Sequence, residues 1–138
     1  MALLDTTVYV DLRGRGGKAR KMEAEAQVLE LLRNGETLFT SRVNIAEIYV
    51  GVELSRESDK ELSALQDYVT WVSVLELDDN SARQFGRVRA ELQKRGKLVG
   101  DMDILIAAVA MANGHAVVTR NRSHFAEIPG LTVISYGK

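Results

Sequence analysis

Acidic residues stand at three places in this sequence where carboxylates could act together. Asp5 directly follows the short apolar run 2–4, and Glu47 lies in the first part of an apolar helical segment. Asp101 and Asp103 precede a second apolar segment. Carboxylates that cluster raise one another's pKa, and a divalent cation removes that repulsion. Oxygen ligands suit Mg²⁺ or Mn²⁺, which can activate a water for in-line attack on a phosphodiester.

Two of these acids have an equally simple structural interpretation. Asp5 could cap a helix that starts at Thr6, because aspartate is a common residue at that position. Glu47 follows Asn44 by three residues, which is nearly the spacing of a capping box. Taken alone, Asp5 fits both interpretations equally well, and Glu47 fits capping better.

The polar residues later in the chain also have both a structural and a functional interpretation. Asp101 and Asp103 could complement the positive end of a helix dipole. However, the segment 104–108 that follows them is so apolar that we expect the start of this helix to lie inside the domain. A carboxylate there is costly unless it is paired or bound to a metal ion, which favours function. Thr119 and Asn121 come just after an apolar run, and a polar turn is the alternative for Asn121.

The elements expected to position these residues are short strands separated by helices. The apolar patterns predict strands over residues 2–4, 37–40, 72–77, 116–119 and 131–134. They predict helices over residues 6–12, 18–33, 43–54, 79–95 and 103–112, and the capping-box pattern from Ser58 to Glu61 predicts one more. Such alternation is typical of a mostly parallel sheet with helices on both faces. We therefore expect a single α/β domain over residues 1–138, which binds its ligand at the carboxyl ends of the strands.

Composition narrows the class of protein. The 138 residues include no cysteine, which excludes disulfides, thiolate zinc sites and cysteine nucleophiles. We recognise no signal peptide and no membrane span, so we expect a cytoplasmic protein. The formal net charge is −1, but basic residues gather in the runs 13–21, 83–97 and 120–122. Such runs are usually solvated helix faces, and they would bind phosphates only if the fold brought them around one cleft.

Four segments together resemble the signature of PIN-domain nucleases, and especially of VapC-type toxins. They are Leu4-Asp5-Thr6-Thr7-Val8, Ile45-Ala46-Glu47-Ile48 with Gly51, Asp103-Ile104-Leu105-Ile106-Ala107-Ala108, and Thr119-Arg120-Asn121 through Phe125 with Ile128-Pro129-Gly130-Leu131. The third segment is the most specific match, and the resemblance covers essentially the whole chain. Two positions depart from the pattern: residue 121 is Asn where many relatives have Asp, and residue 7 is Thr where Asn is common.

The resemblance implies a PIN-like fold and a Mg²⁺- or Mn²⁺-dependent endoribonuclease, the toxin of a type II toxin–antitoxin pair. It implies that Asp5 and Asp103 are the principal metal ligands and that Glu47 is the third acid, with Asp101 close enough to assist. Asn121 would coordinate the metal ion or position a water. A homodimer and a cognate antitoxin that blocks the site are the implied partners. The residues expected to support the acids or contact the RNA are Thr6, Thr7, Thr119 and Arg120.

Three other functions remain open from the sequence. His115 and His124 could cleave RNA through its own 2′-hydroxyl, without a metal ion. The polar residues and basic runs would also serve a catalytically silent RNA-binding module. A phosphatase or a receiver domain could use Asp5 as a phospho-acceptor, but the additional acidic pair and the late lysine of a receiver domain are missing. Chelation of metal ions separates the histidine mechanism from the carboxylate mechanism.

Overall fold

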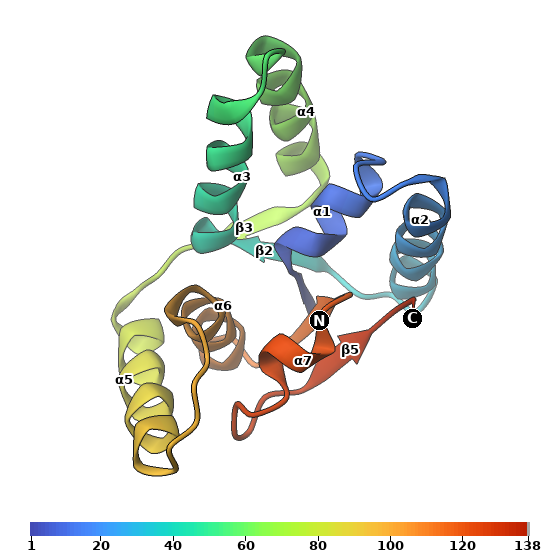
Figure 1. Ribbon diagram of the computed structural model, residues 1–138. Coiled ribbons are helices and arrows are strands. Elements are labelled where there is room, and N and C mark those ends of the chain that lie inside the picture. Colours follow the sequence, from blue (N-terminus) through green and yellow to red (C-terminus); the bar gives the residue numbers. More distant parts are fainter. Residues whose placement is uncertain (138) are drawn as a thin grey trace.

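A five-stranded, all-parallel sheet forms the centre of the computed structural model, which describes residues 1–137 (Figure 1). The strands are β1 (Ala2–Leu4), β2 (Leu38–Ser41), β3 (Ser73–Leu75), β4 (Ala116–Thr119) and β5 (Val133–Ser135). Their order in the sheet is β3-β2-β1-β4-β5. β1 is the middle strand, where Leu3 is paired with Phe39 on one side and with Val117 on the other. The predicted parallel α/β sheet is confirmed.

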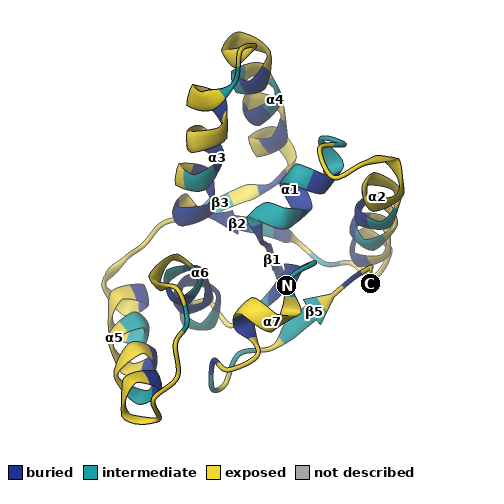
Figure 2. Cartoon of the chain, viewed as in Figure 1, coloured by how far each residue is buried: buried dark blue, intermediate teal, exposed yellow. Residues whose placement is uncertain are grey.

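Helices cover both faces of this sheet. They are α1 (Thr6–Leu12), α2 (Lys18–Arg33), α3 (Arg42–Leu54), α4 (Ser58–Trp71), α5 (Asp79–Lys94), α6 (Asp101–Ala112) and α7 (Arg122–Phe125). Alternate strand residues face the two layers: Leu4 packs in the core with α1 to α4, and Leu3 packs in the core with α5 to α7. Figure 2 shows the central strands buried and the outer helix surfaces exposed. No helix within residues 1–137 is long and apolar enough to span a membrane.

The helix that carries Glu47 is capped differently from the sequence pattern. α3 starts at Arg42, and the Ser41 hydroxyl accepts a hydrogen bond from the backbone N–H of Asn44. The Asn44 side chain accepts in return from the backbone N–H of Ser41, which completes a capping box. Glu47 lies in the second turn of the helix and has no part in this cap. The capping interpretation of Glu47 is therefore wrong.

The predicted capping box of α4 is also wrong, although the helix does start at Ser58. Its N-cap is Glu57, whose side chain makes no capping hydrogen bond. Glu61 instead forms ion pairs with Arg13 (2.9 Å) and Arg15 (2.7 Å), which follow α1. Charge-assisted bonds to guanidinium groups are stronger than a bond to one backbone N–H, so the tertiary contact prevails over the local pattern.

Other boundaries differ by a few residues. α6 starts at Asp101 rather than Asp103, so both aspartates lie in its first turn. The two edge strands, β3 and β5, are shorter than predicted, since each has only one neighbouring strand to pair with. α7 was not predicted, because its four residues are too few for a periodic pattern.

Truncation of a core residue tests the two-layer packing. Ile106 of α6 is 0% exposed, so Ile106→Ala should lower the free energy of unfolding by about 2–5 kcal/mol through the cavity it leaves. Leu54 is 81% exposed, and Leu54→Ala should change the free energy of unfolding by less than about 0.5 kcal/mol. Urea unfolding followed by circular dichroism measures both values. Equal losses for the two variants would contradict the assigned core.

Candidate active site

The acids that the sequence singled out line one cleft at the carboxyl edge of the sheet. The cleft has a volume of about 560 Å³, within the range of ligand-binding sites. It forms there because the ends of parallel strands, and the helices that follow them, meet at one edge. Thr119 is the one predicted site residue that does not line the cleft, since it is fully buried beneath it. The predicted residues that line it are Asp5, Thr6, Thr7, Glu47, Asp101, Asp103, Arg120 and Asn121.

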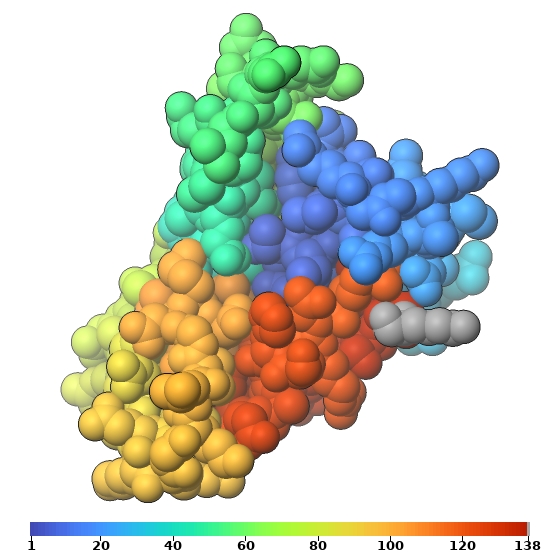
Figure 3. Space-filling model, viewed as in Figure 1, coloured from blue at the N-terminus to red at the C-terminus, as the bar shows by residue number. Residues whose placement is uncertain are grey.

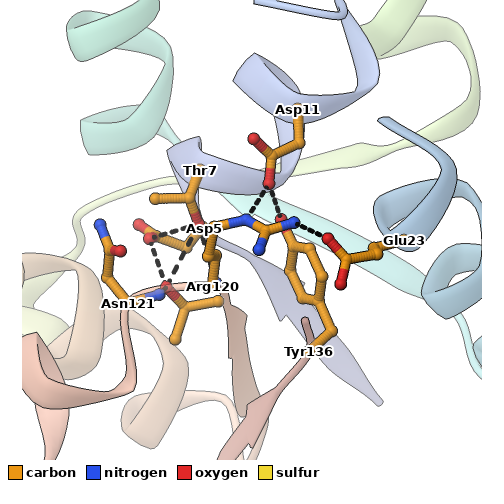
Figure 4. Close-up of polar contacts among 8 residues, drawn as sticks. Asp5, Thr7, Asp11, Glu23, Arg120, Asn121 and Tyr136 are labelled. Carbon is orange, nitrogen blue, oxygen red and sulfur yellow. Dashed lines mark hydrogen bonds and ion pairs between the residues drawn. The ribbon is translucent and has the colours of Figure 1, made fainter. Parts of the chain in front are cut away.

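Asp5 is buried and held by three donors. Its Oδ2 accepts hydrogen bonds from the hydroxyls of Thr119 (2.8 Å) and Thr7 (3.2 Å). Its Oδ1 accepts a longer bond from the Asn44 amide (3.4 Å). Asp5 occupies the N-cap position of α1, but its side chain makes no capping bond. The capping interpretation of Asp5 is therefore wrong, and Figure 4 shows the carboxylate beside Thr7 and Asn121.

Glu47 is oriented by a relay of polar side chains. The Thr6 hydroxyl donates to Glu47 Oε1 (2.6 Å), and it accepts from the Asn44 amide (2.9 Å). Burial raises the pKa of Glu47, the bond from Thr6 opposes that rise, and the charges of Asp5 and Asp103 add to it. Glu47 is thus a half-buried carboxylate that is near other carboxylates and lacks a cationic partner among residues 1–137.

Asn44 is a site residue whose role the sequence did not reveal. Its Oδ1 accepts from the backbone N–H and the hydroxyl of Ser41, and its Nδ2 donates to Thr6 and Asp5. One fully buried amide thereby joins the cap of α3 to two of the acids. The available signal was a polar residue between the apolar positions Val43 and Ile45.

The two aspartates of α6 have different surroundings. Asp103 is half-buried, and burial raises its pKa, while the adjacent His124 lowers it and the charge of Asp5 raises it. The Nδ1 of His124 lies 3.3 Å from Asp103 Oδ2. Asp101 is exposed at the rim of the cleft and pairs with Arg89 (2.9 Å). Asp103 is therefore the better placed of the two to act on a ligand in the cleft.

Arg120 makes contacts that the sequence did not predict. Its Nε donates to Asp11 Oδ2 (2.7 Å), its Nη2 donates to Glu23 (2.9 Å), and its guanidinium lies 5.0 Å from the ring centre of Tyr136. The Tyr136 hydroxyl donates to Asp11 (2.8 Å), which completes the polar network in Figure 4. The backbone N–H of Arg120 donates to Thr7, a residue that holds Asp5. The only sequence signal for Asp11 was its helical spacing from the apolar Val8.

The two histidines are separated by strand β4. His115 precedes the strand, is buried, and stacks on Phe39 with ring centres 4.5 Å apart. Burial lowers its pKa. His124 follows the strand in α7 and lines the acidic cleft, whereas His115 lines a different pocket. This geometry gives no support to catalysis by a histidine pair.

The donor set of the cleft suits a hard divalent cation. Asp5, Glu47 and Asp103 offer oxygen ligands, and the pKa of both Glu47 and Asp103 is raised partly by their neighbours' negative charge. Within residues 1–137, no three acidic or histidine side chains converge as a complete ligand cluster. The oxygen donors of these acids fit an ion such as Mg²⁺, which usually keeps several waters and uses one or two carboxylates.

The sequence profile of the PIN domain matches residues 2–131. The chain belongs to the PIN-domain family. Among curated PIN-domain relatives, Ribonuclease VapC19 of Mycobacterium tuberculosis is 36% identical over 134 residues, which cover 95% of this chain and 97% of the relative.

Solved structures have the same PIN-domain architecture. The structure of VapBC2 from Rickettsia felis bound to a promoter DNA fragment superimposes with a TM-score of 0.86 at 26% identity, and covers 99% of this chain and 98% of that one. VapBC-5 of Mycobacterium tuberculosis is a member of the VapBC family of toxin–antitoxin systems. Its structure superimposes with a TM-score of 0.72 at 27% identity, and covers 97% of this chain and 98% of that one. The expected family resemblance is confirmed.

The raised pKa of Glu47 predicts how stability depends on pH when metal ions are removed. Its folded-state pKa lies above the ordinary value of 4.5, so the stability that Glu47 contributes is present below pH 4.5 and is lost as the pH rises through the folded-state value. Glu47→Gln keeps an oxygen to accept from Thr6 but carries no charge. We expect this variant to be more stable than the wild type at pH 7, and to lose that advantage near pH 4.

Urea unfolding in EDTA at the two pH values measures this difference. Glu53→Gln is the matched control, because Glu53 is exposed on the same helix and should give no pH-dependent gain. A Glu47→Gln variant that is less stable than the wild type at pH 7 would contradict the raised pKa of Glu47.

Proposed function

We propose that this chain is an endoribonuclease that depends on Mg²⁺ or Mn²⁺ and serves as the toxin of a toxin–antitoxin pair. The observation that carries the proposal is the gathering of Asp5, Glu47 and Asp103 at one cleft, with two of them fixed by threonine hydroxyls. The ribonuclease name of the curated relative VapC19 supports the reaction and the substrate class. We also propose that residues 1–138 form one domain, since the PIN-domain match and the sheet extend over nearly all of them.

In this proposal Asp5 and Asp103 would be the principal ligands of the metal ion, and Glu47 would be the third acid beside it. When bound, the ion supplies an activated water and offsets the negative charge that develops on the phosphate. Hydrolysis would join a water oxygen to phosphorus and break the bond from phosphorus to the 3′-oxygen, and the proton that the water gives up would end on that leaving oxygen. The products are a 5′-phosphate and a 3′-hydroxyl.

The protein's own contribution is to hold its acids in fixed positions. Thr7 and Thr119 keep Asp5 Oδ2 from rotating, and Thr6 does the same for Glu47 Oε1. A site whose ligands are oriented before binding loses less entropy when it binds, and it holds the reacting groups in line. Asn121 lines the cleft, and its backbone N–H donates to the Thr119 hydroxyl. In this proposal its amide side chain positions a water.

A protein antitoxin and a second copy of this chain are the proposed partners. The solved relatives are VapBC complexes, one of them crystallised with a promoter DNA fragment and another assigned to a family of toxin–antitoxin systems. Their match over nearly the whole chain supports the same kind of assembly here. The homodimer rests on the family resemblance.

Removal of single carboxylates tests the catalytic assignment. Asp5→Asn and Asp103→Asn should each lower the RNA cleavage rate by at least about 100-fold, because each loses a charge at the reacting centre while keeping its shape. Asp101→Asn should stay within about tenfold of wild type, because that residue is exposed and paired with Arg89. Mapping of RNA 5′ ends after brief expression measures cleavage and identifies the target.

Asp59→Asn, on the exposed surface of α4, is the control and should leave cleavage unchanged. RNA binding without cleavage by the wild-type chain would instead identify a catalytically silent RNA-binding module.

Metal removal is a separate test of the same proposal. EDTA in excess should abolish cleavage by the purified protein, and added Mg²⁺ or Mn²⁺ should restore it, since the cleft offers oxygen ligands. End-group analysis of the fragments should find 5′-phosphates. Cleavage that persists in EDTA, or fragments with 2′,3′-cyclic phosphates, would contradict metal-dependent hydrolysis.

A further inference from the structure

We propose that Arg20 binds a phosphate of the RNA backbone at the rim of the acidic cleft. This inference rests on the proposed function, and it assigns a substrate contact to a residue that belongs to none of the four family-like segments. A cleft lined by carboxylates repels a polyanion, so it needs a cation at its edge to draw the RNA backbone in. The basic residue that supplies this cation must line the cleft and must not already be paired with a carboxylate.

Three cationic or potentially cationic side chains line the cleft: Arg20, Arg120 and His124. The Arg120 side chain is 8% exposed and is bonded to both Asp11 and Glu23, so its charge is already neutralised. His124 lies against Asp103. Among residues 1–137, Arg20 is the one of the three that has no carboxylate oxygen within 4.0 Å.

The position of Arg20 suits contact with an extended ligand. It lies in the first turn of α2, is exposed, and lines both the acidic cleft and an adjoining hollow that also includes Glu23 and Arg120. In Figure 3, the blue surface of α1 and α2 adjoins the orange-red surface of the segment after β4. A strand of RNA with one phosphate at the acids could therefore place a neighbouring phosphate at Arg20.

The loop before α2 leaves space for this side chain. A Cβ atom at position 16 would lie only 2.7 Å from the Cδ of Arg20 and 3.0 Å from Asp11 Oδ1, so the glycine there allows the arginine to lie across the loop. The long side chain thereby reaches the cleft from α2. Its planar guanidinium can bind a phosphate through two parallel hydrogen bonds, which an ammonium group cannot do.

Other basic residues in the run 13–21 and on α2 make useful comparisons. Arg13 and Arg15 are paired with Glu61 on the side of the molecule where α4 packs. Arg33 lies in the last turn of α2, is exposed, and lines neither the acidic cleft nor the hollow beside it. Arg33→Met is therefore the matched control for Arg20→Met: it removes the same charge from the same helix, away from the cleft.

The test is binding of a fluorescein-labelled, 2′-O-methylated 12-nucleotide RNA, measured by anisotropy in EDTA over a range of salt concentrations. This probe reports binding without metal-dependent cleavage. Arg20→Met should weaken binding several-fold, and it should reduce the slope of log K against log salt by about 0.7, the value for one contact to single-stranded nucleic acid. Arg33→Met should change neither quantity. Arg20→Lys should restore the slope, because the charge returns, but only part of the affinity.

The outcomes separate this inference from the proposed nuclease activity. If the wild type cleaves RNA in Mg²⁺ but Arg20→Met and Arg33→Met bind the probe identically, the inference is overturned and the nuclease stands. If the wild type does not cleave RNA but Arg20→Met selectively loses probe binding, the phosphate contact stands and the nuclease falls. Equal weakening by both variants would assign the effect to net charge, and would overturn the inference as well.

Discussion

The burial of the Asp5 carboxylate is the constraint on which the rest of the site depends. A charged oxygen removed from water must be hydrogen-bonded, or the fold loses several kcal/mol in order of magnitude. The donors that satisfy it come from different parts of the chain: Thr7 from α1, Thr119 from the end of β4, and Asn44 from α3. Satisfying one carboxylate therefore fixes three elements against one another. The same geometry places Glu47 and Asp103 at its side.

A second charged group, the largely enclosed guanidinium of Arg120, links α1, α2 and the end of β5. Arg120 joins Asp11 of α1 to Glu23 of α2, and it lies over Tyr136, which directly follows β5. Buried ion pairs are weak sources of net stability because of their desolvation cost, but breaking one is strongly destabilising. The network therefore acts mainly to fix position. It holds the segment after β4 in place, and with it Thr119 beside Asp5.

The sequence predicted the architecture and the grouping of the acids, because both follow from local patterns. Apolar runs identify strands, and parallel strands bring their carboxyl ends to one edge. It did not predict what each polar group contacts. The Ser58–Glu61 spacing matches a capping box, yet Glu61 pairs with Arg13 and Arg15, over forty positions away in the chain. Asn44 and Asp11 were missed for the same reason, since their roles depend on partners that only the folded chain brings near.

The surroundings of a capping carboxylate differ from those of the carboxylates in the cleft. Asp78 is a true N-cap: it accepts hydrogen bonds from the backbone N–H and hydroxyl of Ser81, and these bonds lower its pKa. Glu47 and Asp103 have their pKa shifted in the opposite direction by burial and by neighbouring negative charge. A cap stabilises a helix, whereas these two acids are in surroundings that disfavour their charged forms. Such a cost is typical of residues placed for a ligand that balances the charge rather than for stability of the fold.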